Sequence, residues 1–375
     1  MAPDQAIASP FPASEDFTAL SSRAVAIAGG FGQDVVMTKM HAMVVPQAGG
    51  KFRLEERDIP QPGPQEVRIR VQACGVCHSD TAIVEGHMPG LTYPRVPGHE
   101  VIGVIEALGA EVHGWKPGER VGVGWFSGAC GYCGHCRRGD NFACENVSGA
   151  TGITRDGGYA THMLALASAL AHVPDSLDSV ESAPLLCAGI TTFNAIRNSG
   201  AMPGDVVAIH GVGGLGHLGI QFAARQGFRT VAINRGRDKE ALSLSLGAHY
   251  YIDSAAGDPA AALQALGGAK AIIATVTNAA AMQSIAGGLG TNGTMMVIGV
   301  VGALTVDSLD LLRKRAAVKG WYSGTAADSE DTLSFSREYG VTSMNEIFPL
   351  EEAQAAYDRM KSGKARFRVV LKVGT

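Results

Sequence analysis

The chain has 375 residues, of which 46% are hydrophobic and 18% are charged, with a formal net charge of -4 and a sequence pI near 6.3. A chain of this length buries a large core and commonly divides into two domains, and this composition argues against disorder of the chain as a whole. The acidic balance gives no reason to expect nucleic-acid binding, and no apolar run reaches the roughly 18 residues that a membrane span needs.

Residues 1–36 differ in composition from the rest of the chain, because three prolines stand there among small and acidic residues. A secretory signal needs a basic start and an apolar core, and a mitochondrial presequence is poor in acids. Asp4 and Glu15 occur early in this segment and fit neither. We therefore expect a disordered leader without a catalytic role, on a cytoplasmic protein.

The pattern from residue 37 to about residue 188 predicts a β-rich domain. Alternating apolar and polar residues indicate strands at 66–73, 101–109 and 119–125, and Pro-Gly pairs mark the turns between such segments.

Four cysteines stand close together at Cys130, Cys133, Cys136 and Cys144. Short turns bring the four thiolates together at little loop-closure cost, and Zn²⁺ accepts four sulfur ligands in a closed structural site. The alternatives are disulfides or chance clustering, but disulfides are typical of secreted proteins, which this chain does not resemble. The sequence predicts a structural zinc lobe at 130–144.

From residue 189 to about residue 322 the pattern alternates between strand and helix, which predicts a parallel sheet with crossover helices. Its later strands are expected at 271–276 and 295–300. The motif GVGGLG follows a strand-like run and precedes a helical one, as in dinucleotide-binding folds, where the glycines permit a turn, admit the pyrophosphate and allow close helix packing. The helix N-terminus offers amide donors to the phosphates. The predicted coenzyme-binding residues are Gly211, Gly213, Gly214, Leu215 and Gly216.

The position at the end of the next strand indicates which coenzyme binds. An NAD enzyme usually carries Asp or Glu there, on the ribose hydroxyls. This chain has Asn234 followed by Arg235, so it lacks the carboxylate that would repel a 2′-phosphate and offers a guanidinium that could bind one. NADP(H) is favoured, and NAD(H) with Asn234 on the ribose is the alternative.

These motifs occur in a specific order, which is GVCHSD at 75–80, GHE at 98–100, the four-cysteine lobe, Cys187 in LLCAGITT, and the glycine motif. In this order the chain resembles the zinc-dependent medium-chain alcohol dehydrogenases, especially bacterial and yeast alcohol or cinnamyl-alcohol types, from about Met37 to the C-terminus. The resemblance implies a GroES-like catalytic domain at 37–188, a Rossmann doubly wound parallel-sheet coenzyme domain at 189–322, and a return of 323–375 to the catalytic domain.

The resemblance also implies a catalytic zinc, and hence two Zn²⁺ per chain. Cys77, His99 and Cys187 match the two-cysteine, one-histidine ligand set of alcohol dehydrogenase, which leaves one position open. Glu100 matches a carboxylate behind the metal that approaches it transiently; a buried carboxylate paired with a base is the alternative. Asp80 matches the carboxylate that orients the ligand histidine.

Ser79 matches the hydroxyl that binds the substrate oxygen and takes its proton. The family often ends this relay with a histidine three residues later, where Ala82 stands here, so water or the cofactor ribose must carry the proton. His78 fits a pyrophosphate contact, or is a simple loop histidine. No ligand spacing recommends His87, His162, His210 or His217.

By the same resemblance, Thr191 packs against the nicotinamide and Arg368 contacts the cofactor phosphates, unless Arg368 is a strand-edge arginine that faces water. Trp125 and Phe126 match an aromatic wall that narrows the pocket around an unhindered primary alcohol, including benzyl or cinnamyl types, with Met88 as a deformable neighbour.

The predicted function is the reversible, zinc-dependent oxidation of primary alcohols to aldehydes by a homo-oligomer, either a tetramer or a dimer. A polyol dehydrogenase or another medium-chain reductase is one alternative, which the complete ligand set disfavours. A non-catalytic zinc protein that senses nucleotides or binds nucleic acid is the other, and the absence of a basic patch counts against it.

Overall fold

The computed structural model describes residues 39–88, 91–147 and 149–374. The predicted leader at 1–36 lies outside this range. Within it, no helix combines the length and the apolar character that crossing a membrane requires.

A seven-stranded sheet is organised around β3 (Glu66–Val76), whose alternate residues Val67, Ile69 and Val71 are buried. The first half of β3 pairs with β6, its second half pairs with β15, and β4 runs along its other side. All these pairs are antiparallel, so the period-2 pattern places one face on the core. The other strands of this sheet, and of a separate two-stranded ladder, are β4 (Val101–Leu108), β5 (Arg120–Val123), β6 (His162–Leu166), β7 (Leu170–His172), β14 (Asn345–Pro349), β15 (Arg368–Lys372), β1 (Lys39–Val44) and β2 (Arg53–Asp58).

The last two strands of this sheet come from the end of the chain. β15 pairs with β3 from Val369 opposite Val76 to Lys372 opposite Ala73. Buried residues of α10 (Ala353–Lys361) share the same hydrophobic core. This pairing brings Arg368, the first residue of β15, to the end of β3.

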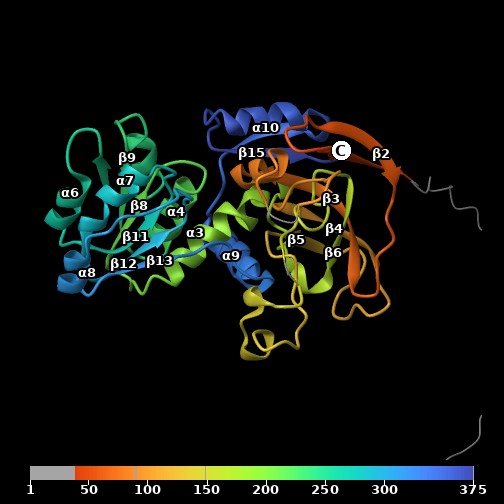
Figure 1. Ribbon diagram of the computed structural model, residues 1–375, viewed down its shortest axis with the longest axis horizontal. Helices are drawn as coiled ribbons and strands as arrows, with labels where there is room; N and C mark the ends of the chain where they lie inside the picture. Colours follow the sequence, from red (N-terminus) through yellow and green to blue (C-terminus); the bar gives the residue numbers. More distant parts are fainter. Residues whose placement is uncertain (1–38, 89–90, 148, 375) are drawn as a thin grey trace, which may run out of the picture. The chain divides into compact units, whose positions relative to one another are not determined.

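The second large sheet has six parallel strands in the order β10-β9-β8-β11-β12-β13 (Figure 1). In chain order this is 3-2-1-4-5-6, the order of a Rossmann sheet. The predicted fold class, a β-rich GroES-like domain with a Rossmann sheet, is confirmed. The strands are β8 (Val206–His210), β9 (Arg229–Asn234), β10 (Tyr250–Asp253), β11 (Ala269–Ala274), β12 (Leu289–Val297) and β13 (Ala317–Gly320).

Helices cover both faces of this sheet because its strands are apolar on both. Val207 and Ile209 of β8 share a buried cluster with residues of α3 and α4, whereas Val206 and Ala208 share another with residues of α6 and α7. In addition to α10, the α-helices of the described residues are α1 (Thr81–Val84), α2 (Ser179–Ser182), α3 (Ala188–Arg197), α4 (Gly216–Arg225), α5 (Glu240–Ser245), α6 (Pro259–Ala265), α7 (Ala279–Ser284), α8 (Ser308–Lys314) and α9 (Ala326–Tyr339).

One strand begins well before its predicted position. The apolar run predicted a strand at 295–300, but β12 begins at Leu289 and ends at Val297. The backbone amides of Ile298 and Gly299 both donate to the carbonyl of Ala274, at 3.1 and 3.0 Å, and this ends the ladder. The additional residues at the start of β12 include Asn292, which has a positive φ of 56°. A pattern of apolar residues does not indicate such a conformation.

A buried histidine ties the glycine motif to the C-terminal segment. His217, the second residue of α4, donates from Nδ1 to the carbonyl of Gly213 at 3.0 Å, and its Nε2 accepts from the amide of Met344 at 3.2 Å. Only the neutral ring can do both. Burial lowers the pKa of His217 to about 4.

This geometry predicts an acid-sensitive contribution to stability. The pKa of about 4 lies below the ordinary 6.5, so the contribution is complete above pH 6.5 and is lost as the pH falls toward 4. The corresponding loss of stability is on the order of 3 kcal/mol. The variant His217→Gln, which can still accept from Met344, should unfold with a flatter pH dependence. Urea unfolding of both proteins at pH 7 and pH 5 measures the difference, and equal losses would contradict the assignment.

Candidate active site

Four side chains that are far apart in the sequence lie together. Ligand atoms of Cys77, His99, Glu100 and Cys187 are all within 4.8 Å of one another. Cys77 follows β3 and His99 precedes β4, and because these strands are paired, both residues lie at one edge of the sheet. Cys187 lies between the short helix η5 (Ala183–Leu186) and α3, with its Sγ 3.7 Å from that of Cys77.

The donor atoms of this cluster fit a zinc ion. His99 is fully buried, and its Nε2 has no hydrogen-bond partner among the described residues. A buried lone pair of this kind costs free energy unless a ligand takes it. The hydrogen bond with Cys187 lowers the pKa of the Cys77 thiol well below its usual range, although burial opposes this. Two sulfurs and an imidazole are a zinc-binding set with a position left open.

Asp80 holds two of these ligands in place. It is buried in the 3₁₀ turn His78–Asp80, its Oδ1 is 3.2 Å from His99 Nδ1, and its Oδ2 accepts from the backbone amide of Cys77 at 2.9 Å. The hydroxyl of the fully buried Tyr159 also donates to Oδ2, at 2.8 Å. The contact with His99 leaves Nε2 free for a metal, the arrangement that orients metal-binding histidines. Tyr159 carries no motif in the sequence and was missed there.

The same turn carries the other two candidates of the GVCHSD motif. Ser79 is half-buried, and the residue before it, His78, is exposed to solvent. The hydroxyl of Thr81 donates to the carbonyl of His78 at 2.7 Å, which fixes the turn.

Glu100 and Arg368 form a buried ion pair beside the cluster. Arg368 donates through Nη2 to Glu100 Oε1 and, at 3.4 Å, to the carbonyl of Val76. Arg368 is 6% exposed, so the alternative of an arginine facing water is wrong. Burial raises the pKa of Glu100 to about 8, although the charge of Arg368 opposes this. Glu100 is therefore paired with a base, as the second alternative expected, and one of its oxygens also lies within 4.8 Å of the ligand atoms of Cys77, His99 and Cys187.

Arg368 also reaches the glycine motif. A Cβ atom added at Gly214 would lie 3.1 Å from Arg368 Nη1. The guanidinium thus stands between the carboxylate of the metal cluster and the loop predicted to bind the coenzyme phosphates. Neither contact is visible in the sequence, because β15 must first pair with β3.

The four cysteines of the lobe form a second cluster, with all four Sγ atoms within 4.8 Å of one another. Backbone amides point at the sulfurs, from Cys133 to Cys130 Sγ at 3.3 Å and from Cys136 to Cys133 Sγ at 3.5 Å. Burial raises the pKa of Cys130, but the hydrogen bonds to its sulfur outweigh burial and lower it to about 6. All seven cysteines are free thiols, so no disulfide joins them. The donor set fits a closed structural zinc site.

The glycine motif follows β8 and leads into α4. Gly211 has a φ of 102°, and a Cβ there would meet Thr275 Oγ1 at 2.8 Å. A Cβ at Gly216 would lie 1.8 Å from the carbonyl oxygen of Gly211, whereas one at Gly213 would meet nothing within 4 Å. The first and third glycines are thus required by the turn itself, and the second faces open space in which a phosphate could lie.

The end of β9 carries the predicted selectivity residues. Asn234 accepts from the amide of Val212 at 3.3 Å and donates to the carbonyl of Arg235 at 3.1 Å. Arg235 is exposed, whereas Arg237 is paired with Glu240 at 2.7 Å. Lys239 was missed in the sequence: its Nζ donates to the carbonyl of Val212, and burial lowers the pKa of its ammonium group.

Thr191 and the two predicted aromatic residues come from other elements and have different neighbours. Thr191 is buried on α3 and accepts from the amide of Ser323 at 3.1 Å. The ring of Trp125 packs edge-on against His99, with centroids 4.9 Å apart. Phe126 instead stacks on Phe142 at 6.2 Å. Trp125 thus packs against a residue of the metal cluster, and the role of both aromatic residues as a pocket wall stays a prediction.

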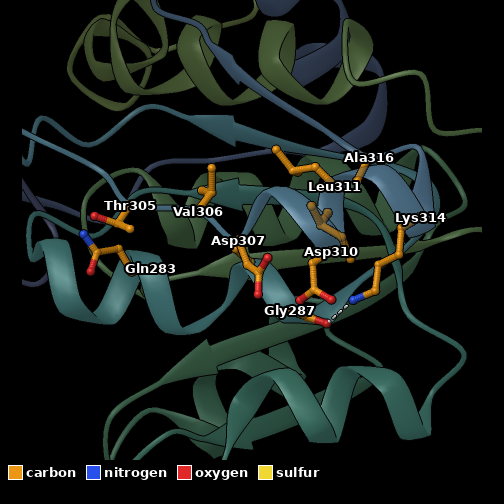
Figure 2. A pocket seen from close by; sticks show the side chains of 11 residues that line it. Gln283, Gly287, Thr305, Val306, Asp307, Asp310, Leu311, Lys314 and Ala316 are labelled. Atoms are coloured by element: carbon orange, nitrogen blue, oxygen red, sulfur yellow. Dashed lines mark hydrogen bonds between the residues drawn. The ribbon is translucent and has the colours of Figure 1, made fainter.

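A different cavity lies beside α8, with a volume of about 150 Å³ (Figure 2). Asp307 caps this helix through the amide of Leu309 at 2.8 Å, and Lys314 donates to the carbonyl of Gly287 at 2.7 Å. None of the cysteine-cluster residues lines it. Its polar groups serve the local fold and give it no link to the site.

Comparison with known proteins identifies the family. Residues 63–175 match the alcohol dehydrogenase GroES-like domain, and residues 214–338 match the zinc-binding dehydrogenase domain. The alcohol dehydrogenase notN of Aspergillus sp. is 42% identical over 328 residues, which cover 88% of this chain and 96% of that protein. The chain belongs to the zinc-dependent medium-chain alcohol dehydrogenases. The predicted family and enzyme class are confirmed, and the non-catalytic alternative is wrong.

Solved structures agree with this alcohol dehydrogenase assignment. The crystal structure of AibC superposes with a TM-score of 0.84 at 27% identity and covers 93% of this chain and all of that one. The cinnamyl alcohol dehydrogenase of Sorghum bicolor superposes with a TM-score of 0.78 at 29% identity, over 89% of this chain and 97% of that one. This alcohol dehydrogenase is thus an oxidoreductase of the zinc-dependent medium-chain type that acts on small molecules.

The glycine motif yields a matched pair of variants. Gly216→Ala should lower the free energy of unfolding by about 1–3 kcal/mol, because its Cβ has no room. Gly213→Ala should change it by less than about 0.5 kcal/mol, since its Cβ meets nothing, but should weaken coenzyme binding by about tenfold, or 1.4 kcal/mol. Urea unfolding and coenzyme titration test both variants, and undiminished coenzyme binding by Gly213→Ala would contradict the assigned phosphate position.

Proposed function

We propose that this alcohol dehydrogenase interconverts primary alcohols and aldehydes, with one hydride passing between the substrate carbon and NADP(H) or NAD(H) and one proton released or taken up. The observation that supports the proposal most strongly is the buried cluster of two thiols and one imidazole, whose Nε2 has no hydrogen-bond partner among the described residues. Arg368, which also approaches the glycine motif, is paired with Glu100 of this cluster.

Two zinc ions per chain belong to this proposal. Cys77, His99 and Cys187 would hold the catalytic ion, and the four cysteines of the lobe would hold the structural one. When bound, the catalytic ion supplies Lewis-acid polarisation of the alcohol or carbonyl oxygen. Asp80 keeps the His99 ring in the orientation that points Nε2 toward the ion. Glu100, paired with Arg368, would lie beside the three ligands.

Ser79 is proposed to hydrogen-bond the substrate oxygen and to take its proton. It directly precedes Asp80 in the turn that also carries Cys77. Ala82, three residues later, has no group that could pass the proton on, so the route continues through solvent or the coenzyme ribose. Thr191, fixed by its bond from Ser323, supports the nicotinamide in this proposal, and the exposed His78 is available to the pyrophosphate.

NADP(H) is the favoured coenzyme. Asn234 brings no negative charge to the end of β9, and Arg235 is exposed without an ion-pair partner among the described residues. A free guanidinium can bind a phosphate through two hydrogen bonds.

The coenzyme assignment predicts a selective effect. Arg235→Ala should raise KM for NADP(H) by about 10- to 100-fold, since hydrogen bonds between charged groups contribute roughly 1.5–3 kcal/mol, and should change KM for NAD(H) little. Arg237→Ala is the matched control, because Arg237 is already paired with Glu240. Initial rates with both coenzymes measure the ratio, and equal changes for the two coenzymes would overturn the preference.

The substrate class rests on the aromatic wall. Trp125 crowds the space beside His99 with a flat surface, which favours unhindered primary alcohols over branched ones. The similarity to the sorghum cinnamyl alcohol dehydrogenase supports the inclusion of benzyl and cinnamyl types.

The two clusters should respond differently to loss of one sulfur. Cys187→Ala should abolish turnover and remove one zinc ion while the unfolding midpoint stays nearly unchanged. Cys133→Ala should lower the midpoint, because a closed thiolate site contributes folding free energy directly. Zinc analysis, thermal unfolding and turnover of both variants make the test. Full turnover by Cys187→Ala would sink the catalytic assignment.

We also propose a cytoplasmic homo-oligomer, either a tetramer or a dimer. The lack of a disulfide among the seven cysteines, all of which lie in the described part of the chain, supports a reducing compartment. β13 lies at the edge of the parallel sheet, and its residue Val318 is exposed, as is Leu312 of α8, which supports self-association.

A further inference from the structure

The loop that follows β9 carries Arg235, the cation on which the proposed coenzyme preference depends. The start of this loop is fixed, because the carbonyl of Asn234 accepts from the amide of Ser254 at 3.0 Å and the Asn234 side chain donates to the carbonyl of Arg235 at 3.1 Å. On the side of the glycine motif, the Asn234 side chain accepts from the amide of Val212 at 3.3 Å, and Lys239 donates to the carbonyl of Val212. Both backbone polar groups of Val212 therefore bind this loop.

The residue after Arg235 is Gly236, which has a positive φ of 76°. Glycine has more conformational freedom than any other residue. A Cβ atom added at Gly236 would meet nothing within 4 Å, so no neighbouring atom confines the backbone on that side. Because Gly236 adjoins Arg235, a movement of the glycine would displace the arginine. Hydrogen bonds to Gly236 are therefore needed to keep Arg235 in one place.

Two side chains of β10 supply these hydrogen bonds. Asp253 Oδ1 accepts from the amide of Gly236 at 2.7 Å, and the hydroxyl of Tyr251 donates to the carbonyl of Gly236 at 2.5 Å. Burial raises the pKa of Tyr251, so its hydroxyl keeps the proton that it donates. Both backbone polar groups of Gly236 are thus bound by side chains of the neighbouring strand.

The register of the parallel sheet explains why these two side chains reach the loop. β10 pairs with β9 so that Tyr251 lies opposite Ala232 and Asp253 lies opposite Asn234. Residues two apart in a strand point to the same face of the sheet. The amide of Ala255 also donates to Asp253 Oδ1, at 2.8 Å, and this fixes the carboxylate. This oxygen of Asp253 is therefore bound to backbone amides.

The side chain of Arg235 is left unpaired by this arrangement. It is exposed and has no ion-pair partner among the described residues, whereas Arg237 in the same loop is paired with Glu240. The backbone on both sides of Arg235 is held while its guanidinium stays available to an anion. A group that is already held in its binding position loses less conformational entropy when it binds.

We propose that Tyr251 and Asp253 are positioning residues for the choice of coenzyme, because they hold Gly236 and thereby place Arg235 where it binds the 2′-phosphate of NADP(H). The proposal rests on the proposed function and deepens it. NAD(H) carries a ribose hydroxyl in place of this phosphate, so it gains little from the position of a guanidinium. Loss of either hydrogen bond to Gly236 therefore weakens the binding of NADP(H) selectively.

The test is a titration of the full-length, zinc-loaded enzyme with NADPH and with NADH, which measures Kd for each. Tyr251→Phe keeps the ring and removes the hydroxyl, and Asp253→Ala removes the carboxylate. For each variant we expect Kd for NADPH to rise about fivefold, as for the loss of one hydrogen bond, and Kd for NADH to change by less than about twofold. Asp253→Asn should restore most of the affinity, because its amide oxygen can still accept from Gly236.

A double-mutant cycle distinguishes positioning from a separate effect on the fold. Because Tyr251 acts through Arg235, Tyr251→Phe should change Kd for NADPH by less than about twofold when Arg235 is already alanine. Tyr250→Phe is the matched control and should leave both Kd values unchanged, since Tyr250 points to the other face of β10, where its ring centroid lies 5.9 Å from the guanidinium of Arg229. Equal changes for the two coenzymes in Tyr251→Phe, or a fivefold loss that persists beside Arg235→Ala, would overturn the proposal.

Alcohol turnover, measured in parallel, separates this proposal from the proposed function. If the wild type oxidises no primary alcohol with either coenzyme, the proposed function fails, and the titrations still judge Tyr251 and Asp253. If Arg235→Ala weakens NADPH binding selectively while Tyr251→Phe and Asp253→Ala do not, the coenzyme assignment stands and the positioning role is wrong. The absence of a selective effect of Arg235→Ala overturns both.

Discussion

The register of β3 with its two neighbours is the constraint on which the site depends. Cys77 follows the end of β3, His99 and Glu100 precede β4, and Arg368 begins β15. Pairing of Cys74 with Val101 and of Val76 with Val369 brings all of these to one edge of the sheet. A shift of one residue in the register of β3 with a neighbour would turn side chains to the opposite face of the sheet, so that the residues of the cluster would no longer lie together.

Burial makes this arrangement costly as well as specific. The carboxylates of Asp80 and Glu100 have no exposed surface, and each is held by defined partners rather than by water. A buried ion pair gains little net stability, yet the loss of one partner leaves an uncompensated charge. Even the backbone is adapted, because a Cβ at Gly75 would lie 1.8 Å from Glu100 Oε2. Stability is thus spent on holding buried ionisable groups around a place where a cation can bind.

The features that the sequence predicted well are the local ones. The four cysteines of the lobe and the glycine motif are each contained in a short segment, whose spacing already limits what its side chains can do. The Rossmann sheet follows from the alternation of strands and helices. The ligand Cys187 was reached only through resemblance, because no local spacing links it to Cys77, which lies 110 residues away.

The features that sequence analysis missed depend on tertiary contacts. Tyr159 and Lys239 carry no motif, and their roles come from a buried carboxylate and a loop carbonyl contributed by distant segments. His217 lacks ligand spacing, yet it joins the glycine motif to Met344 across 127 residues.

X-ray absorption at the zinc edge of the purified enzyme tests the central claim most directly. The account predicts two zinc ions per chain, one bound by two sulfurs and a histidine nitrogen and the other by four sulfurs. The average is then about three sulfur ligands per zinc ion. A single zinc ion per chain with four sulfur ligands would place metal in the lobe alone, and would contradict the account of Cys77, His99 and Cys187 as a metal site.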